Sequence, residues 1–181
     1  MVGNFIGDFV KGRNLLEQFE PEIARGIEVH RAIDAFTDSH PVVRKSKIRL
    51  RPTYRHYAPV IVDVFYDHFL ARYWDQYHTE SLADFAERAY RTIERQQTML
   101  PEGVKYMLPY MIKGNWLVNY ATLEGIHRAL SGMTRRASHP SRMDESINDL
   151  RLHYDDFRKE FEEFFPELEQ HIKTMLAEPL R

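Results

Sequence analysis

The sequence contains no cysteine among its 181 residues. This absence excludes disulfide frameworks, zinc–cysteine sites and thiolate nucleophiles, and it is typical of proteins from the reducing cytoplasm. No apolar run approaches the roughly 18 residues that suggest a membrane span, and the first residues lack the basic start and apolar core of a signal peptide. We therefore expect a cytoplasmic protein that has no membrane contact.

Net charge is also small, because 25 Lys and Arg residues stand against 27 Asp and Glu residues. A net charge of −2 gives no overall attraction toward nucleic acid, and we expect no nucleic-acid partner. The charges are unevenly distributed, however, because no acidic residue occurs between Ser39 and Val62. This stretch, the basic segment, contains Arg44, Lys45, Lys47, Arg49, Arg51 and Arg55. It is either an ordinary solvated face or a docking surface for an acidic macromolecule or a phosphate.

Apolar residues recur at helical spacing throughout the chain, and strand patterns are almost absent. We predict one all-α domain, a helical bundle over residues 1–181. The clearest helix is expected from Arg142 to Phe165, followed by a tail from Pro166 that docks or frays. Other helices are expected from Pro21 to Asp38, Pro41 to Pro52, Val60 to Tyr77, Ser81 to Leu100, Val104 to Ile112 and Thr122 to Arg135. Ser81 and Asp84 have the spacing of a capping box.

Histidine and carboxylate residues supply the candidate chemistry. His30 and Asp34 are four residues apart on a predicted helix and therefore share a face. Asp63 and Asp67 repeat this spacing on a later helix, and His68 follows directly among apolar neighbours. Charged groups among apolar neighbours are costly unless they are paired or bind a metal.

Asp8, between Phe5, Ile6, Phe9 and Val10, is a further acidic candidate. Mixed histidine and carboxylate ligation suits Mn²⁺, Fe²⁺ or Mg²⁺. The residues alone leave other interpretations open: helix caps, salt bridges to the basic segment and hydrogen-bonded core histidines.

Cationic and aromatic residues complete the candidate site of a phosphate hydrolase. Arg55, Arg135 and Arg136 are candidates for binding a phosphate and sharing its negative charge. Trp116, in the segment NWLVNY, is a candidate for the wall of a substrate channel, although a packed core aromatic fits equally well.

Five segments together resemble the acyl carrier protein phosphodiesterase family, a distant branch of the helical His–Asp (HD-domain) metallophosphohydrolases. These segments are GNFIGDFVKG, GIEVHRAIDAFTD, APVIVDVFYDHFL, NWLVNY and LSGMTRR, and they extend over nearly the whole chain. The resemblance implies hydrolysis of the phosphodiester that links 4′-phosphopantetheine to a serine of holo acyl carrier protein. It also implies manganese as the cofactor. Carried onto this chain, it assigns metal and catalytic roles among His30, Asp34, Asp67 and His68, with Asp8 and Asp63 supporting or ligating.

The resemblance gives the basic segment a specific interpretation, because acyl carrier proteins are acidic. We expect Arg44, Lys45, Lys47, Arg49 and Arg51 to help dock the carrier protein.

Members of this family begin with a further stretch upstream of GNFIGDF that contains a histidine, and we expect this chain to lack that stretch. Two alternatives stay open: hydrolysis of a nucleotide or another small phosphodiester, and a non-catalytic helical module that binds an acidic partner. The sequence leaves the oligomeric state undetermined.

Overall fold

The computed structural model describes residues 1–177, and these residues form helices and connecting turns without a strand. This confirms the prediction of an all-α chain. The short N-terminal helix α1 (Val2–Ile6) precedes five longer helices and a one-turn helix. They are α2 (Pro21–Ser39), α3 (Pro41–Tyr54), α4 (Ala58–Arg72), α5 (Leu82–Glu94), α6 (Glu102–Lys113) and α7 (Trp116–Asn119). The remaining helices are α8 (Leu123–Arg136), α9 (Ile147–Leu152) and α10 (Tyr154–Ala177).

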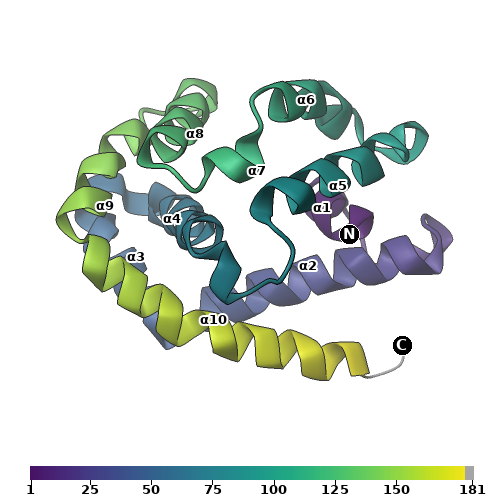
Figure 1. The fold of residues 1–181 in the computed structure, drawn as a ribbon, viewed down its shortest axis with the longest axis horizontal. Coiled ribbons are helices and arrows are strands. Elements are labelled where there is room, and N and C mark those ends of the chain that lie inside the picture. The colour runs from purple at the N-terminus through teal and green to yellow at the C-terminus, as the bar shows by residue number, and fades with distance from the viewer. Residues whose placement is uncertain (178–181) are drawn as a thin grey trace.

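Two hydrophobic clusters organise these helices. The larger cluster joins α3, α4, α8, α9 and α10, with Phe65, Phe69 and Phe157 among its fully buried side chains. The second joins α1, α2, α5 and α6 around Ile6 and Ile27. In Figure 1, α2 and α10 lie side by side along one edge of the molecule, while α4 and α1 lie in different parts of the interior. Elements from both clusters contribute to the site described below.

Close packing of α1 against α2 depends on two glycines. A Cβ atom on Gly3 would lie 2.0 Å from the Ile23 carbonyl oxygen, and one on Gly26 would lie 2.9 Å from the Gly3 Cα. No side chain fits at these distances, so both positions require glycine. The two glycines bring the turn after α1 directly over the middle of α2.

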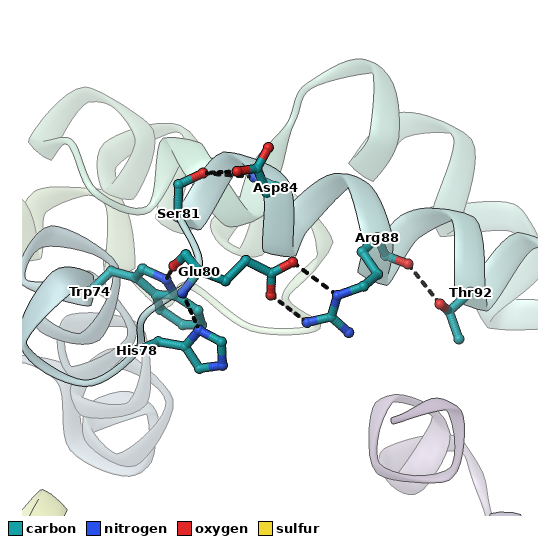
Figure 2. A network of polar contacts seen from close by, with 7 residues as sticks. All are labelled: Trp74, His78, Glu80, Ser81, Asp84, Arg88 and Thr92. Atoms are coloured by element: carbon teal, nitrogen blue, oxygen red, sulfur yellow. Dashed lines mark hydrogen bonds and ion pairs between the residues drawn. The ribbon is translucent and has the colours of Figure 1, made fainter.

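The start of α5 confirms Ser81 as the cap that the spacing of Ser81 and Asp84 predicted. Ser81 Oγ accepts a hydrogen bond from the Asp84 backbone nitrogen at 3.1 Å and donates to the Asp84 carboxylate at 2.7 Å. Figure 2 shows this cap beside the Glu80–Arg88 ion pair and the hydrogen bond from the Trp74 indole to the Glu80 carbonyl. These contacts fix the connection between α4 and α5.

The prediction of one helix from Arg142 to Phe165 is wrong. That segment contains a 3₁₀ turn (Met143–Ser146), α9 and the first half of α10, with a break at His153, where φ is −115° and ψ is 30°. Conversely, α10 continues through Pro166, where the sequence predicted a new segment. Phe164 and Phe165 explain the continuity, because their rings pack on Tyr66 and Tyr77 and hold the helix against the core.

Two other predicted helices end earlier than expected. Helix α4 ends at Arg72 and a separate 3₁₀ turn (Trp74–Gln76) follows, while α5 ends at Glu94 rather than Leu100. Among the described residues, no helix combines the length and the apolar composition that crossing a bilayer requires.

Candidate active site

Asp8, His30 and Asp34 form a cluster of potential metal ligands. His30 Nε2 lies 3.2 Å from Asp8 Oδ1 and 3.2 Å from Asp34 Oδ2. One ligand atom from each residue lies within 4.8 Å of the others, and within residues 1–177 no other set of three His, Asp or Glu residues meets this condition. Both carboxylates are exposed, whereas the His30 side chain is only 18% exposed. The cluster therefore faces solvent and has a mostly buried imidazole at its base.

Local backbone geometry explains how Asp8 reaches a helix that begins thirteen residues later. Gly7 lies against the His30 ring so closely that a Cβ atom would be 2.3 Å from the ring carbons. Arg31 also donates a hydrogen bond to the Val10 carbonyl at 3.1 Å, which ties the next residues to α2. The glycine and the arginine together hold Asp8 beside His30.

Helix α4 contributes Asp63 and Asp67. Both side chains keep access to solvent, yet the surrounding protein displaces much of the water around them. This desolvation raises the pKa of Asp63 to about 6, with Lys47 opposing the shift and nearby carboxylates adding to it. It raises the pKa of Asp67 to about 7, with a further contribution from the Asp63 charge. The two aspartates therefore resist ionisation in the absence of a neighbouring cation.

The carboxylates of the Asp8–His30–Asp34 cluster act electrostatically on Asp63 of α4. The charges of Asp38, Asp34 and Asp8 all act on Asp63, and Asp8 and Asp38 also raise the pKa of Asp34, for which desolvation is the largest cause. Lys47 is the basic residue of this group, and its Nζ lies 2.8 Å from Asp38 Oδ1. One lysine is insufficient to neutralise five acidic side chains, so the group is suited to bind a cation.

His68, which the sequence predicts at a shared site with Asp67, makes hydrogen bonds with Tyr120 and Tyr154. Its Nδ1 is 2.8 Å from the Tyr120 carbonyl oxygen, and its Nε2 is 2.9 Å from the Tyr154 hydroxyl. The side chain is 2% exposed, and desolvation lowers the pKa of its imidazole. Consecutive helical residues point in different directions, so the Asp67 side chain is exposed while His68 is buried in the core.

A cavity of about 690 Å³ has Tyr120 in its wall. It lies between α6, α7 and α8, and its lining includes Trp116, Tyr120, Arg135 and Arg136, three of which the sequence had singled out. Tyr120 links the cavity to the carboxylates, because burial and the nearby Asp67 charge raise the pKa of its hydroxyl. Arg136 acts on the same hydroxyl in the opposite direction. Sequence reasoning missed Tyr120, although it ends the singled-out segment NWLVNY.

The residues of the basic segment lie on different faces of α3 and of the turn that follows it, so some are exposed and others contact the protein. Arg44, Lys45, Arg51 and Arg55 are exposed, whereas Lys47 pairs with Asp38, and Arg49 forms a two-pronged ion pair with Glu160 at 2.7 and 2.8 Å. Two of the five predicted docking residues therefore face the protein itself. Within residues 1–177, no hydrogen bond or ion pair links Arg55 to the carboxylates of the site.

Comparison with known proteins identifies the relatives of this chain. The model of the family described as "Acyl carrier protein phosphodiesterase" matches residues 1–168. The chain belongs to this family. It is 36% identical over 167 residues to an acyl carrier protein phosphodiesterase from Photorhabdus laumondii, covering 92% of this chain and 84% of the relative. Proteins of the same name from Yersinia enterocolitica and Escherichia coli are each 35% identical, again over 92% of this chain and 86% of the relative. No solved structure matches.

The residues of this family member fit a divalent cation. The cluster offers one imidazole nitrogen and carboxylate oxygens, the donor types that Mn²⁺, Mg²⁺ and Fe²⁺ accept, and it contains no soft sulfur ligand. Desolvation, with a smaller contribution from neighbouring carboxylates, raises the pKa of Asp63 and Asp67 and so disfavours their ionised forms. A bound cation would favour the ionised forms and release the protons.

Proposed function

We propose that this chain is a metal-dependent phosphodiesterase that hydrolyses the bond between 4′-phosphopantetheine and the serine of holo acyl carrier protein. The products are apo acyl carrier protein and free 4′-phosphopantetheine. The observation that supports the proposal is the cluster of Asp8, His30 and Asp34, with ligand atoms within 4.8 Å of one another, in a chain that the family model matches over residues 1–168. The charges of Asp8 and Asp34 also act on Asp63 of α4.

In this proposal, His30, Asp34 and Asp8 hold the metal ion, and Asp63 and Asp67 complete its surroundings. Manganese is the first candidate, and Mg²⁺ and Fe²⁺ are compatible with the same donors. A divalent ion at this position supplies Lewis acidity toward a phosphoryl oxygen and makes water more acidic. His68 is left out of the ligand set because both its ring nitrogens have partners within the protein.

The remaining roles follow from position. Asp67, one helical turn beyond Asp63 and next to Tyr120, is placed to exchange a proton with the attacking water or with the departing serine oxygen. Arg136, near the Tyr120 hydroxyl, is placed to share the negative charge that develops on the phosphate. Arg44, Lys45 and Arg51 are exposed and form the proposed docking surface for the acidic carrier protein.

The direct test is electrophoretic conversion of holo to apo acyl carrier protein with Mn²⁺ and with a chelator. We expect conversion with Mn²⁺, loss of conversion with chelator, and loss in the variants His30→Ala and Asp34→Asn. Asp156→Asn is a matched control, because Asp156 also pairs with a histidine, His153, at 3.4 Å, but on α10. Conversion that persists after chelation would show that the metal part of the proposal is wrong.

The same assay separates the alternatives. Cleavage of a small phosphodiester without any conversion of holo carrier protein would indicate a different substrate. Carrier-protein binding that is unchanged in Asp34→Asn, without conversion by any variant, would indicate a non-catalytic module.

A further inference from the structure

Gly132 differs from the other glycines that lie inside the helices of this chain. A Cβ atom on Gly3, Gly26 or Gly125 would collide with backbone atoms within 3 Å. On Gly132, the nearest neighbour of a Cβ atom would be the end of the flexible Arg135 side chain, at 3.9 Å. Nothing in the packing therefore requires glycine at this position, although glycine stabilises a helix interior less than alanine does.

The space beside Gly132 belongs to the cavity between α6, α7 and α8. One face of α8 lines this cavity, and it is built from small, flexible or cationic residues: Gly125, Arg128, Ala129, Gly132, Met133 and Arg136. The adjoining face of α8 contributes the buried residues Ile126 and Leu130 to the core. Gly132 thus keeps the cavity wide at a cost in helix stability.

The opposite wall is aromatic. Tyr106 and Tyr110 lie one turn apart on α6 with ring centroids 5.6 Å apart, and they are 74% and 57% exposed. Trp116 lines the cavity from α7. Exposed aromatic side chains that line a cavity are typical of a binding site for a ligand with apolar and polar groups.

The charge around the cavity indicates that the ligand carries an anionic group. Within residues 1–177, no ion pair links Arg128, Arg135 or Arg136 to a carboxylate, and Arg128 instead donates to the Asn119 amide oxygen at 3.1 Å. Elsewhere, Arg49, Arg88 and Arg158 are all ion-paired. Arg136 and Tyr120 both line the cavity, and the charges of Arg136 and Asp67 both act on the Tyr120 hydroxyl. The phosphate end of a ligand would therefore lie toward the carboxylate group, with the rest of the ligand extending toward Tyr110.

We propose that this cavity, kept open by Gly132, binds the 4′-phosphopantetheine arm of the substrate, with the scissile phosphate at the Tyr120 end. This inference rests on the proposed function. The arm contains two amides, a hydroxyl, a dimethyl-substituted carbon and methylene groups and ends in a thiol, which suits a cavity lined by tyrosine, tryptophan, methionine and asparagine. A cavity of about 690 Å³ is within the range of about 300–1,000 Å³ that small-molecule sites occupy.

The test is a series of substitutions, Gly132→Ala, Gly132→Leu and Gly132→Phe, that fill the cavity progressively. The open space at Gly132 predicts that all three fold, which thermal unfolding checks. We expect KM for holo carrier protein to rise with side-chain size, by at least tenfold for Gly132→Phe, and kcat to change less. His127→Phe is the matched control, because His127 is exposed on α8 but does not line this cavity.

A second readout is direct binding, followed by the change in tryptophan fluorescence when free 4′-phosphopantetheine is added. Wild type should bind it, and Gly132→Phe should bind at least tenfold more weakly. Unchanged KM and unchanged binding in Gly132→Phe, in an enzyme whose wild type converts holo carrier protein, would overturn the cavity assignment while leaving the proposed function standing. A wild type that does not convert holo carrier protein would instead overturn the proposed function.

Discussion

His30 and His68 each have an aspartate close by in the sequence, but the structure gives them opposite surroundings. His30 lies 3.2 Å from two carboxylates at a solvent-facing cluster. His68 is buried, and its ring nitrogens contact the Tyr120 carbonyl and the Tyr154 hydroxyl. The spacing explains the difference, because residues four apart share a helix face and adjacent residues do not. The residue type identifies a candidate ligand, and the position of the residue around the helix determines whether its side chain reaches the site.

The largest effects should follow from substitutions at the cluster. His30→Ala removes the imidazole that lies between Asp8 and Asp34, so we expect holo carrier protein conversion to fall at least about 100-fold, on the order of the largest losses caused by disturbing the partners of metal ligands. The unfolding midpoint should fall only modestly, because the mostly buried imidazole also packs against Gly7 but contacts two exposed carboxylates. Rate measurements at saturating Mn²⁺ check the first expectation, and urea unfolding checks the second. A stable His30→Ala variant that keeps wild-type rates would remove His30 from the site.

His68→Ala should show the reverse pattern. The substitution leaves two polar partners unsatisfied and opens a cavity among Phe69 and Tyr154, so we expect a loss of about 2–4 kcal/mol of unfolding free energy. Mn²⁺ affinity of the folded fraction should remain at the wild-type value. Tyr154→Phe is the matched control, since it removes only one of the two hydrogen bonds and should cost about 1 kcal/mol. If His68→Ala instead lost Mn²⁺ binding and kept its unfolding free energy, His68 would belong to the metal site and the contrast with His30 would be wrong.

Asp67 gives a pH-dependent test of the carboxylate group. An unfolded aspartate has a pKa of about 3.9, whereas that of Asp67 in the folded protein is about 7. The stability that the protonated carboxyl contributes is therefore present below about pH 4 and is lost as the pH rises through about 7. Asp67→Asn cannot ionise, so in chelator it should lose less stability than wild type between pH 5 and pH 8. We expect a difference on the order of 1 kcal/mol, because solvent access screens the effect.

Urea unfolding at the two pH values measures this difference. Parallel stability profiles for the wild type and Asp67→Asn would contradict the raised pKa.

The basic segment likewise has exposed residues and residues that contact the protein. Substitutions in it should have the smallest effect on carrier-protein turnover. Arg44→Glu/Lys45→Glu reverses two exposed charges, whereas Lys47 and Arg49 face the protein. We expect kcat/KM for carrier protein to fall severalfold at low salt, and the difference to disappear near 1 M salt, where the Debye length is about 3 Å. Arg91→Glu/Arg95→Glu on α5 is the matched control. Equal effects of the two double variants would show that the docking is not local to α3.

Much of the fold and part of the site could be predicted from the sequence. Helices α2, α6 and α8 follow from their periodicity and their boundary residues, and the cluster of His30 and Asp34 follows from their spacing. The break at His153 and the passage of α10 through Pro166 could not be predicted, because tertiary packing of Phe164 and Phe165 overrides the local signals.

Other parts of the site depend on contacts between distant segments. The role of Gly7 depends on the His30 ring, which lies 23 residues later in the chain. The surroundings of His68 depend on Tyr154, 86 residues away. The role of Gly132 depends on the space between three helices. None of these contacts has a local pattern that would reveal it.

The most direct test of the central claim is Mn²⁺ binding followed by electron paramagnetic resonance, in which the signal of free Mn²⁺ decreases as the ion binds. Wild type and Tyr154→Phe should deplete the free signal equally, and His30→Ala and Asp34→Asn should leave most of it in solution. Equal depletion by all four proteins, or depletion that is lost only in Tyr154→Phe, would contradict a metal centre at Asp8, His30 and Asp34.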